Sequence, residues 1–245
     1  MVSASPNPSS GEPTDDRPLI VRLIEFLKYR RFEPGERLPS ERYLSMRFGV
    51  GRNALREAVA MLTALRVLET KPNSGIYLRD LSAESSFEAT ILMSDLGTAP
   101  SAQEVIDMME VRITLELDAL TRACERRTEE DIAQLRDILQ QTDALLEAEG
   151  NMSELDHAFH MKLAASSHNA VLVRILNAFY RLSLPRRRVY FESVDAGRAS
   201  SAHHHQLVDA LERRDAEAAR RLIQAHLDGA TRYWAEVLGV RQPSE

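Results

Sequence analysis

Residues 38–65 read LPSERYLSMRFGVGRNALREAVAMLTAL, and this stretch decides the fold of the first third of the chain. Ser40 is a favourable N-cap for a short helix that stops at the glycine-containing turn at 48–51. A longer helix then begins at Arg52, because apolar residues recur at steps of three and four from Leu55 onward. The stretch therefore predicts a short helix, a tight turn and a second helix.

The flanking residues complete a small domain around these two helices. An amphipathic pattern at 18–30 predicts a helix before them, and two β-prone runs at 67–70 and 76–78 follow them. The residues between the two runs read KPNSG at 71–75, which is typical of a hairpin turn. We therefore predict a three-helix core with a β-wing.

From residue 82 onward the patterning is helical throughout. Apolar residues recur most regularly between 105 and 124, and no repeat period indicates a solenoid. We expect breaks between helices at 97–101, 127–128, 150–153, 166–169, Pro185, Gly197 and 213–215. Successive amphipathic helices with short breaks predict an antiparallel bundle of six or seven helices, so the fold class is mostly α.

Composition limits the classes of protein to which the chain can belong. With 245 residues, of which 44% are hydrophobic and 28% charged, it is a globular protein of one large or two modest domains. The single cysteine, Cys124, cannot form an intrachain disulfide, and residues 1–18 contain no apolar core of a signal peptide. No run approaches the ~18 apolar residues of a membrane helix. We therefore expect a cytoplasmic protein with no membrane partner.

Charge divides the chain into two parts. Residues 17–80 carry 13 Lys and Arg against 7 Asp and Glu, a net charge of +6, whereas residues 81–245 carry −9. A cationic module suits a polyanion such as DNA, which repels an acidic one. We predict a disordered tail at 1–16, a winged helix-turn-helix DNA-binding domain at 17–80, a linker with the first bundle helix at 81–100, and a helical effector-binding and dimerisation domain at 101–240.

The second helix of the pair begins with the side chains that a DNA reader needs. The major groove is about 12 Å wide and admits one helix, which must present polar or basic groups at its start. Arg52 and Arg56 lie one turn apart, so both can face the duplex, while Arg42 on the preceding helix could hold a phosphate. The hairpin tip could reach the minor groove or the backbone. The candidate DNA contacts are therefore Arg42, Arg52, Asn53, Arg56, Asn73 and Gly75. The alternative is an ordinary helical subdomain with a solvated basic face.

The module contains the motifs PG at 34–35, LPSER at 38–42, FGVGR at 48–52 and LREA at 55–58. In these motifs it resembles the winged helix-turn-helix domain of GntR-type transcriptional regulators. The resemblance implies that four residues contact operator DNA, with Arg52 as the base reader: Arg42, Arg52, Arg56 and Gly75. Gly51 departs from the family pattern, which usually has Ser or Thr there, so a helix-capping hydroxyl and its phosphate contact are missing.

Four residues of the acidic part could hold a metal ion. Asp156 and His160 are four residues apart, so they project from one helix face. His204 and His226 lie at nearly equal distances from the turn expected at 213–215, roughly 15 Å along their helices, so an antiparallel pair brings them to the same height. Buried neutral imidazoles facing a carboxylate are unfavourable unless a group such as a divalent cation satisfies them. The alternative is a set of core histidines without an ion.

The remaining polar clusters are interpreted as structural. The register at 203–205 is open, so either neighbour could replace His204 as a ligand. The other four histidines are interpreted as solvated or as hydrogen-bond donors to ligands: His157, His168, His203 and His205. The triple arginine at 186–188 is interpreted as a solvated helix face, with a route for anions as the alternative.

The second half contains DxxFH at 156–160, SHN at 167–169, Arg112 with Glu116, and spaced matches from 204 to 227. In these residues it resembles the helical effector-binding (FCD) domain of the FadR subfamily. The resemblance implies a divalent metal with open positions for a small carboxylate effector, with Arg112 as an effector-binding residue. The resemblance implies that the ligands of this metal are Asp156, His160, His204 and His226. Three imidazoles and one carboxylate suit Zn²⁺, Ni²⁺ or Mn²⁺.

Together these observations predict a homodimeric transcriptional regulator. We expect a repressor that binds a short palindromic operator and responds to a small carboxylate metabolite at the metal. A metal-dependent enzyme is the rival from another class, but no further general base stands out near the ligands, so we expect no enzymatic activity. A third alternative is a DNA-binding dimer in which the metal is purely structural.

Overall fold

The computed structural model describes residues 17–80, 84–95 and 99–240. The disordered tail expected at 1–16 lies outside the described residues. The chain divides into two compact units, residues 1–98 and 99–245. None of the helices described is both long and apolar enough to cross a membrane.

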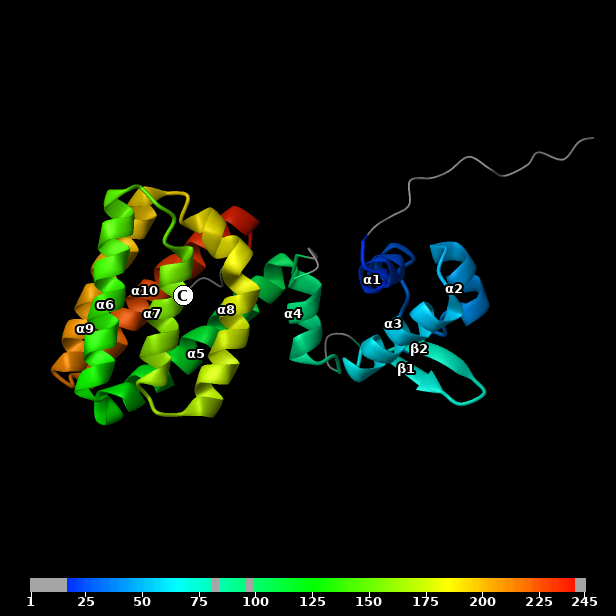
Figure 1. Cartoon of the computed structure of the whole chain (residues 1–245), viewed down its shortest axis with the longest axis horizontal. Coiled ribbons are helices and arrows are strands. Elements are labelled where there is room, and N and C mark those ends of the chain that lie inside the picture. The colour runs from blue at the N-terminus through cyan, green and yellow to red at the C-terminus, as the bar shows by residue number, and fades with distance from the viewer. Residues whose placement is uncertain (1–16, 81–83, 96–98, 241–245) are drawn as a thin grey trace, which may run out of the picture. The chain divides into compact units, whose positions relative to one another are not determined.

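The first unit has, in its described residues, four helices and a two-stranded sheet (Figure 1). They are α1 (Leu19–Tyr29), α2 (Glu41–Phe48), α3 (Arg52–Ala64), β1 (Leu68–Lys71), β2 (Gly75–Leu78) and α4 (Phe87–Asp95). One apolar core joins the first three helices to the sheet, and its centre consists of fully buried leucines: Leu23, Leu44, Leu55 and Leu62. This order of elements confirms the predicted helix-turn-helix with a β-wing.

The turn between α2 and α3 is built from the capping residues that the sequence indicated. The Ser40 side chain accepts a hydrogen bond from the backbone N–H of Tyr43 at 3.3 Å and so caps α2. Gly49 ends α2 in the left-handed region with φ 65°, which favours glycine. Gly51 precedes α3 and provides no side-chain cap. The hydroxyl that the family pattern usually supplies at this position is thus absent.

The hairpin requires glycine at position 75 for its own geometry. β1 and β2 pair antiparallel, with Leu68 opposite Leu78. In the turn, φ is 56° at Asn73 and 137° at Gly75, and residues with a Cβ rarely adopt the second value. A Cβ at Gly75 would also lie 2.7 Å from Nε of Arg37. These two constraints explain Gly75 independently of any contact with DNA.

The helix after the hairpin belongs to the first unit, which differs from the first bundle helix expected at 81–100. Ala89 of α4 is buried in the core of the first unit, and Met93 packs against the same core. The backbone N–H of Ser86 also donates to the carbonyl of Leu65 at 3.0 Å. Helical patterning predicted a helix here, but it does not reveal which core the helix joins.

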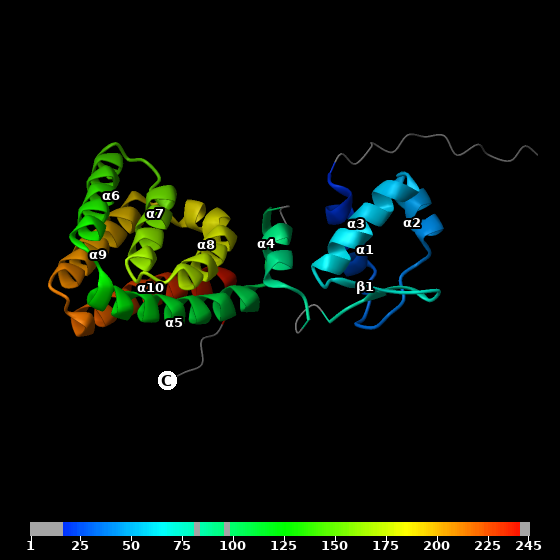
Figure 2. The same cartoon turned by 60° about the horizontal axis from the view of Figure 1, so that its bottom comes forward.

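The second unit is an all-α bundle, with six helices in its described residues (Figure 2). They are α5 (Ala102–Arg126), α6 (Glu129–Glu147), α7 (Ser153–Ala165), α8 (Ala170–Tyr190), α9 (Val194–Glu212) and α10 (Ala216–Leu238). The long helix α5 is central, because it contacts α7, α8, α9 and α10. The predicted fold class, a winged helix-turn-helix followed by a helical bundle, is confirmed.

The break expected at Pro185 is wrong, because this residue lies inside α8. Proline removes one backbone donor and crowds the preceding turn, so a helix that continues past it needs other support. Here the carbonyl of Tyr180 accepts hydrogen bonds from Oγ of Ser183 at 3.1 Å and from Nη2 of Arg187 at 3.2 Å. These two side chains add bonds to α8 in the stretch just before the proline.

The break expected at Gly197 is also wrong, because this residue lies in the first turn of α9. A Cβ at Gly197 would lie 2.8 Å from Cδ2 of Leu146 and 3.4 Å from Sδ of Met152. Glycine is therefore present for close packing of the helix start. The turn before α9 lies at residues 191–193 instead.

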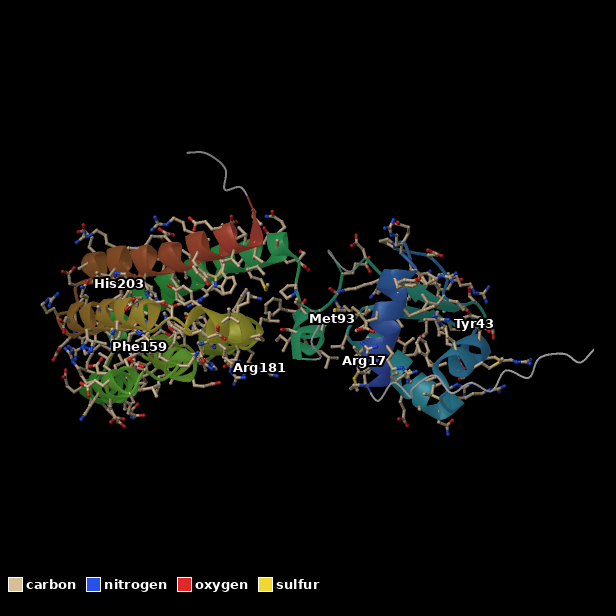
Figure 3. All side chains as sticks on the ribbon, turned by 90° about the horizontal axis from the view of Figure 1, so that it is seen from above. Arg17, Tyr43, Met93, Phe159, Arg181 and His203 are labelled. Carbon is tan, nitrogen blue, oxygen red and sulfur yellow. The ribbon has the colours of Figure 1, made fainter. Side chains whose placement is uncertain are left out.

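Apolar side chains fill the interior of the bundle, and one of them is Phe159, which is labelled in Figure 3. The largest group of buried residues contains side chains with no exposed surface from five of the six helices: Leu120, Leu135, Phe159, Leu207, Leu211, Ile223 and Leu227. Burial of this kind is the main source of stability for a helical bundle.

Leu135 tests this core. Leu135→Ala should lower the free energy of unfolding of the second unit by about 2–5 kcal/mol, because it removes buried methyl groups and leaves a cavity. Val171→Ala on α8, where the side chain is 55% exposed, should change it by less than about 0.5 kcal/mol. Urea unfolding followed by fluorescence of Trp234, the single tryptophan, reports on this unit alone. Equal losses from both substitutions would contradict the assigned core.

Candidate functional site

The predicted DNA-contacting residues of α2 and α3 are exposed to solvent. Arg42 lies on α2, and Arg52, Asn53 and Arg56 lie within the first five residues of α3. The apolar face of α3 is buried on the opposite side, beginning with Leu55. The arrangement leaves the start of α3 open to a ligand as large as DNA.

Arg56 differs from Arg42 and Arg52 because it has an ionic partner among the residues that the structure describes. Its Nε lies 2.9 Å from Oε2 of Glu41 on α2, with the two side chains 64% and 37% exposed. An exposed ion pair of this kind is weak, so it orients the guanidinium without withdrawing it from solvent. At the hairpin tip Asn73 is exposed and Gly75 is half-buried.

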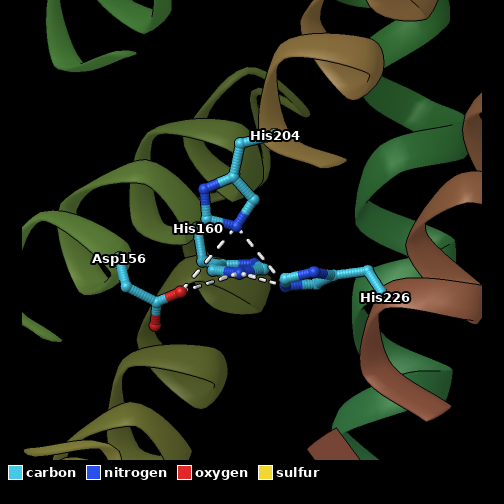
Figure 4. Close-up of side chains that lie close together, drawn as sticks. All are labelled: Asp156, His160, His204 and His226. Atoms are coloured by element: carbon cyan, nitrogen blue, oxygen red, sulfur yellow. Dashed lines mark hydrogen bonds and ion pairs between the residues drawn. The ribbon is translucent and has the colours of Figure 1, made fainter. Parts of the chain in front are cut away.

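Four side chains from three helices converge inside the second unit (Figure 4). Asp156 and His160 come from α7, His204 from α9 and His226 from α10. Nε2 of His226 lies 3.4 Å from Nε2 of His204 and 3.3 Å from Nε2 of His160. Oδ1 of Asp156 lies 3.6 Å from Nε2 of His160 and 3.8 Å from Nε2 of His204. The structure thus brings together all four residues that were predicted as metal ligands.

Glu116 of α5 fixes the orientation of the His160 ring. Nδ1 of His160 lies 2.6 Å from Oε2 of Glu116, and both side chains are buried. Because a carboxylate only accepts hydrogen bonds, Nδ1 carries a proton. In the neutral ring Nε2 is then a lone pair directed at the other ligands, as in a metal-binding histidine.

The other two rings are kept neutral by their surroundings. Burial, reinforced by His160, lowers the pKa of His204 well below its usual range. Burial also lowers the pKa of His226, and His204 and His160 add to this effect. Phe159 stacks on His204 with ring centres 3.9 Å apart, which adds an apolar wall. Neutral imidazole is the form that binds a metal ion.

The donor set fits a divalent first-row metal ion. Four bonds of about 2.0–2.1 Å in tetrahedral geometry place neighbouring ligand atoms about 3.3–3.4 Å apart. The separations of the His226 nitrogen from those of His204 and His160 agree with this value, and the separations from Asp156 are slightly longer. All four ligand atoms lie within 4.8 Å of one another. The residues could therefore hold a metal, and their chemistry suits Zn²⁺, Ni²⁺ or Mn²⁺.

A buried network of charged and polar groups supports the ligands. Nη1 of Arg187 donates to Oδ2 of Asp156 at 3.1 Å, which leaves Oδ1 to face the histidines. Nε of Arg112 donates to Oε1 of Glu116 at 2.6 Å. The Tyr180 hydroxyl donates to the same oxygen at 2.7 Å and accepts a bond from Arg112. Each carboxylate next to the cluster is thus held by a guanidinium.

The network also sets the protonation of its members. Burial opposes the charge of Glu116, but His160 and Arg112 lower its pKa below the usual range. Burial raises the pKa of Tyr180 well above its usual value, so this residue remains a hydroxyl donor. The carboxylate that orients His160 therefore stays ionised in the interior.

The sequence identified this network only in part. Arg112 and Glu116 were named through a family resemblance, and their i, i+4 spacing is a direct signal of a pair on one helix. Tyr180 carried no signal, because its partners are distant in the sequence. Arg187 was interpreted as part of a solvated face, which is wrong, since only 5% of it is exposed. The expected break at Pro185 concealed the inward face of α8.

The structure distinguishes His204 from its neighbours. His205 lies outside the cluster, with Nε2 2.9 Å from Oδ2 of Asp143. His203 faces a cavity beside His226, with ring centres 5.7 Å apart. The last two histidines stand apart from the cluster, one stacked on a tyrosine ring and one bonded to an aspartate: His157 and His168.

A cavity of about 180 Å³ opens beside the four ligands. Asp156 and His226 form part of its wall, so a small molecule inside it can reach the cluster. Four arginines line it: Arg112, Arg186, Arg187 and Arg232. Aromatic side chains line much of the rest: Tyr190, Phe191 and Trp234. A largely apolar cleft with a few convergent polar groups is the usual form of a small-molecule site.

Both units match known protein families. Residues 19–78 match the family described as bacterial regulatory proteins, gntR family. Residues 107–229, half of the chain, match the FCD domain. The two matches correspond to the winged module and to the bundle that holds the four ligands.

Individual proteins of similar sequence and fold agree with these matches. The HTH-type transcriptional regulator LutR of Bacillus subtilis (strain 168) is 33% identical over 165 residues, covering 66% of this chain and 72% of that protein. The putative L-lactate dehydrogenase operon regulatory protein of Escherichia coli (strain K12) is 29% identical, with 84% and 81% covered. The structure of Lar, which controls the Listeria monocytogenes agr system, shares the fold with a TM-score of 0.63 and 23% identity, covering 93% of this chain and all of that one.

His204 and His226 should make the second unit sensitive to acid. Their pKa values in the folded protein lie below the ordinary value of about 6.5. As pH falls through that value, these two side chains therefore bind protons in the unfolded chain but remain neutral in the folded one. We expect the free energy of unfolding of chelator-treated protein to fall between pH 7.5 and 5.5, by up to about 1.4 kcal/mol per pH unit for each histidine. Urea unfolding followed by Trp234 fluorescence measures it.

The double variant His204→Gln/His226→Gln is the control for this pH dependence. Its stability should vary less with pH over the same interval, whatever its stability at pH 7.5. A slope equal to that of the unaltered protein would show that other groups cause the acid sensitivity.

Proposed function

The chain belongs to the GntR family of bacterial regulatory proteins and carries an FCD domain. From this premise we propose that the protein is a homodimeric repressor and that it senses a small organic acid at a metal ion. The matched relatives are transcriptional regulators, which are DNA-binding proteins and not enzymes. The observation that carries the proposal is a four-ligand cluster facing an arginine-lined cavity, in a chain that also has a winged helix-turn-helix.

In the proposed complex with DNA, α3 enters the major groove. Arg52 reads base edges because it is the first residue of the helix and has no ionic partner within the described residues. Arg42 on α2 contacts a phosphate, and two further contacts come from Asn53 and Arg56. Residues Asn73 to Gly75 of the hairpin contact the backbone or the minor groove. Two copies of the chain place two such helices on a short palindrome.

In the proposed sensor, the ligands of the metal are Asp156, His160, His204 and His226. When bound, the ion supplies a concentrated positive charge that attracts carboxylate oxygens. Arg112, which lines the cavity, supplies hydrogen-bond donors for the same acid. One relative's name refers to an L-lactate dehydrogenase operon, and lactate is a small hydroxy acid of the kind this site would accept.

The proposed response follows from the position of the cavity between helices. Its lining comes from α5, α7, α8, α9 and α10, so an acid inside it contacts several helices at once. Such a ligand favours the arrangement of helices that fits it best. A tenfold loss of operator affinity needs only about 1.4 kcal/mol of coupling.

An operator-binding titration tests the sensor. With Zn²⁺ present, a small carboxylate such as L-lactate or succinate should weaken binding to promoter DNA of the protein's own gene by about tenfold. A chelator should abolish the response. His226→Ala should abolish it too, whereas His205→Ala should preserve it, because His205 pairs with Asp143 outside the cluster.

Two results would contradict this mechanism. Equal responses with metal and with chelator would remove the ion from it. A chelator that lowers the melting temperature, without any effect of acids on operator affinity at any metal loading, would assign the ion a structural role alone.

The DNA contacts are tested by a pair of arginine variants. Arg52→Ala should cost about 1–3 kcal/mol of operator binding and relax the sequence preference, because it removes a base contact. Arg42→Ala should weaken binding to all duplexes and lower the slope of log affinity against log salt by about 1, because it removes a phosphate contact. Fluorescence anisotropy over a range of salt concentrations measures both. Matching losses from the two variants would refute this division of roles.

A further inference from the structure

The cavity beside the cluster contains more positive charge than its walls neutralise. Its charged lining consists of four arginines and one aspartate: Arg112, Arg186, Arg187, Arg232 and Asp156. Two of these arginines are paired with buried carboxylates, Arg112 with Glu116 at 2.6 Å and Arg187 with Asp156 at 3.1 Å. A charge withdrawn from water is costly unless an opposite charge is near it. The excess therefore favours an anionic ligand.

Two arginines of this lining have no ionic partner among the described residues, Arg186 and Arg232, and Arg186 is the less exposed of the two. It is half-buried on α8 and forms no hydrogen bond or ion pair with any residue that the structure describes. Burial, together with the guanidinium groups of Arg112 and Arg187, lowers its pKa to about 10. The residue is thus charged at neutral pH and surrounded by like charge. Arg188, two residues further along, is instead exposed and pairs with Glu154 at 2.8 Å.

We propose that the cavity binds an organic acid with two anionic groups and that Arg186 binds the second of them. This inference rests on the proposed function, in which the first carboxylate binds at the cluster. Asp156 and His226 line the cavity together with Arg186, so one small molecule can contact both places. A guanidinium binds carboxylate and phosphate groups through paired, charge-assisted hydrogen bonds. The second group is accordingly a carboxylate or a phosphate.

The charge balance favours a dianion over a monoanion. Arg186 leaves one half-buried positive charge unmatched in the lining, Arg232 adds one on the exposed side, and a divalent ion at the cluster would add two more. A monocarboxylate neutralises one of these charges and leaves Arg186 without a partner. Tyr190, Phe191 and Trp234 also give part of the cavity an apolar wall, and a less polar environment strengthens an ion pair formed beside it.

Calorimetric titration of the full-length, Zn²⁺-loaded protein tests the proposal. Propionate, succinate and 3-phosphonopropionate differ only in the group at the far end of the molecule. Butyrate and glutarate repeat the comparison with one more carbon. At least one of the dianionic acids should bind at least about tenfold more tightly than its monocarboxylate counterpart. Comparison of the second carboxylate with the phosphonate identifies which anion the site prefers.

Three substitutions on α8 test whether Arg186 causes the preference for dianions. Arg186→Gln should reduce the preference for dianions to less than about twofold, because it removes the partner of the second anion. Arg186→Lys should retain part of the preference, because it keeps the charge but loses the paired geometry. Arg188→Gln removes an equal charge from the exposed side of α8 and should leave the preference unchanged. Melting curves of the zinc-loaded variants verify that each is folded.

The possible outcomes separate this inference from the function on which it rests. Monocarboxylates and dianions that bind equally well would overturn the role of Arg186 and leave the acid sensor intact. A dianion preference that survives in Arg186→Gln would likewise overturn it. Failure of every acid to bind, with or without zinc, would overturn both proposals.

Discussion

The hydrogen bond between His160 and Glu116 is the interaction on which the chemistry of the second unit depends. It determines which nitrogen of the ring faces the other ligands, and it does so from a different helix, α5. Glu116 can remain ionised in the interior because Arg112 and Tyr180 both bond to its other oxygen. One chain of buried bonds thus joins α5, α7 and α8, and the geometry of the cluster follows from their packing.

Such a network is not the most stable way to fill a bundle. Buried ion pairs often contribute no more to stability than well-packed apolar side chains of similar volume, whereas loss of one partner is strongly destabilising. The surrounding core consists mainly of leucine, valine, isoleucine and alanine, so apolar side chains could have filled these positions too. The two buried pairs, Arg112 with Glu116 and Arg187 with Asp156, are better explained as supports that hold metal ligands in one orientation.

Local patterns predicted the winged module and four converging ligands, but not the groups around them. The module follows from signals close together in sequence, such as the Ser40 cap and the Gly49 turn, which the structure reproduces. Asp156 and His160 share a helix face, so their convergence also follows from local spacing. Tyr180 lies 64 residues from Glu116 and carries no local signal. The placement of α4 was missed for a similar reason, because an amphipathic pattern does not specify its partner.

Because α8 continues past Pro185, the residues that follow the proline reach the cavity beside the metal-ligand cluster. Had the helix ended there, Arg186 and Arg187 would not belong to the wall of the cavity. Arg187 bonds to the carbonyl of Tyr180, one turn before Pro185, and also to Asp156. The same guanidinium therefore bonds to the helix backbone close to the proline and orients a candidate metal ligand. An anion that binds beside it acts on α8 next to Pro185, a residue that lacks a backbone donor, which gives ligand binding a direct physical means of altering the bundle.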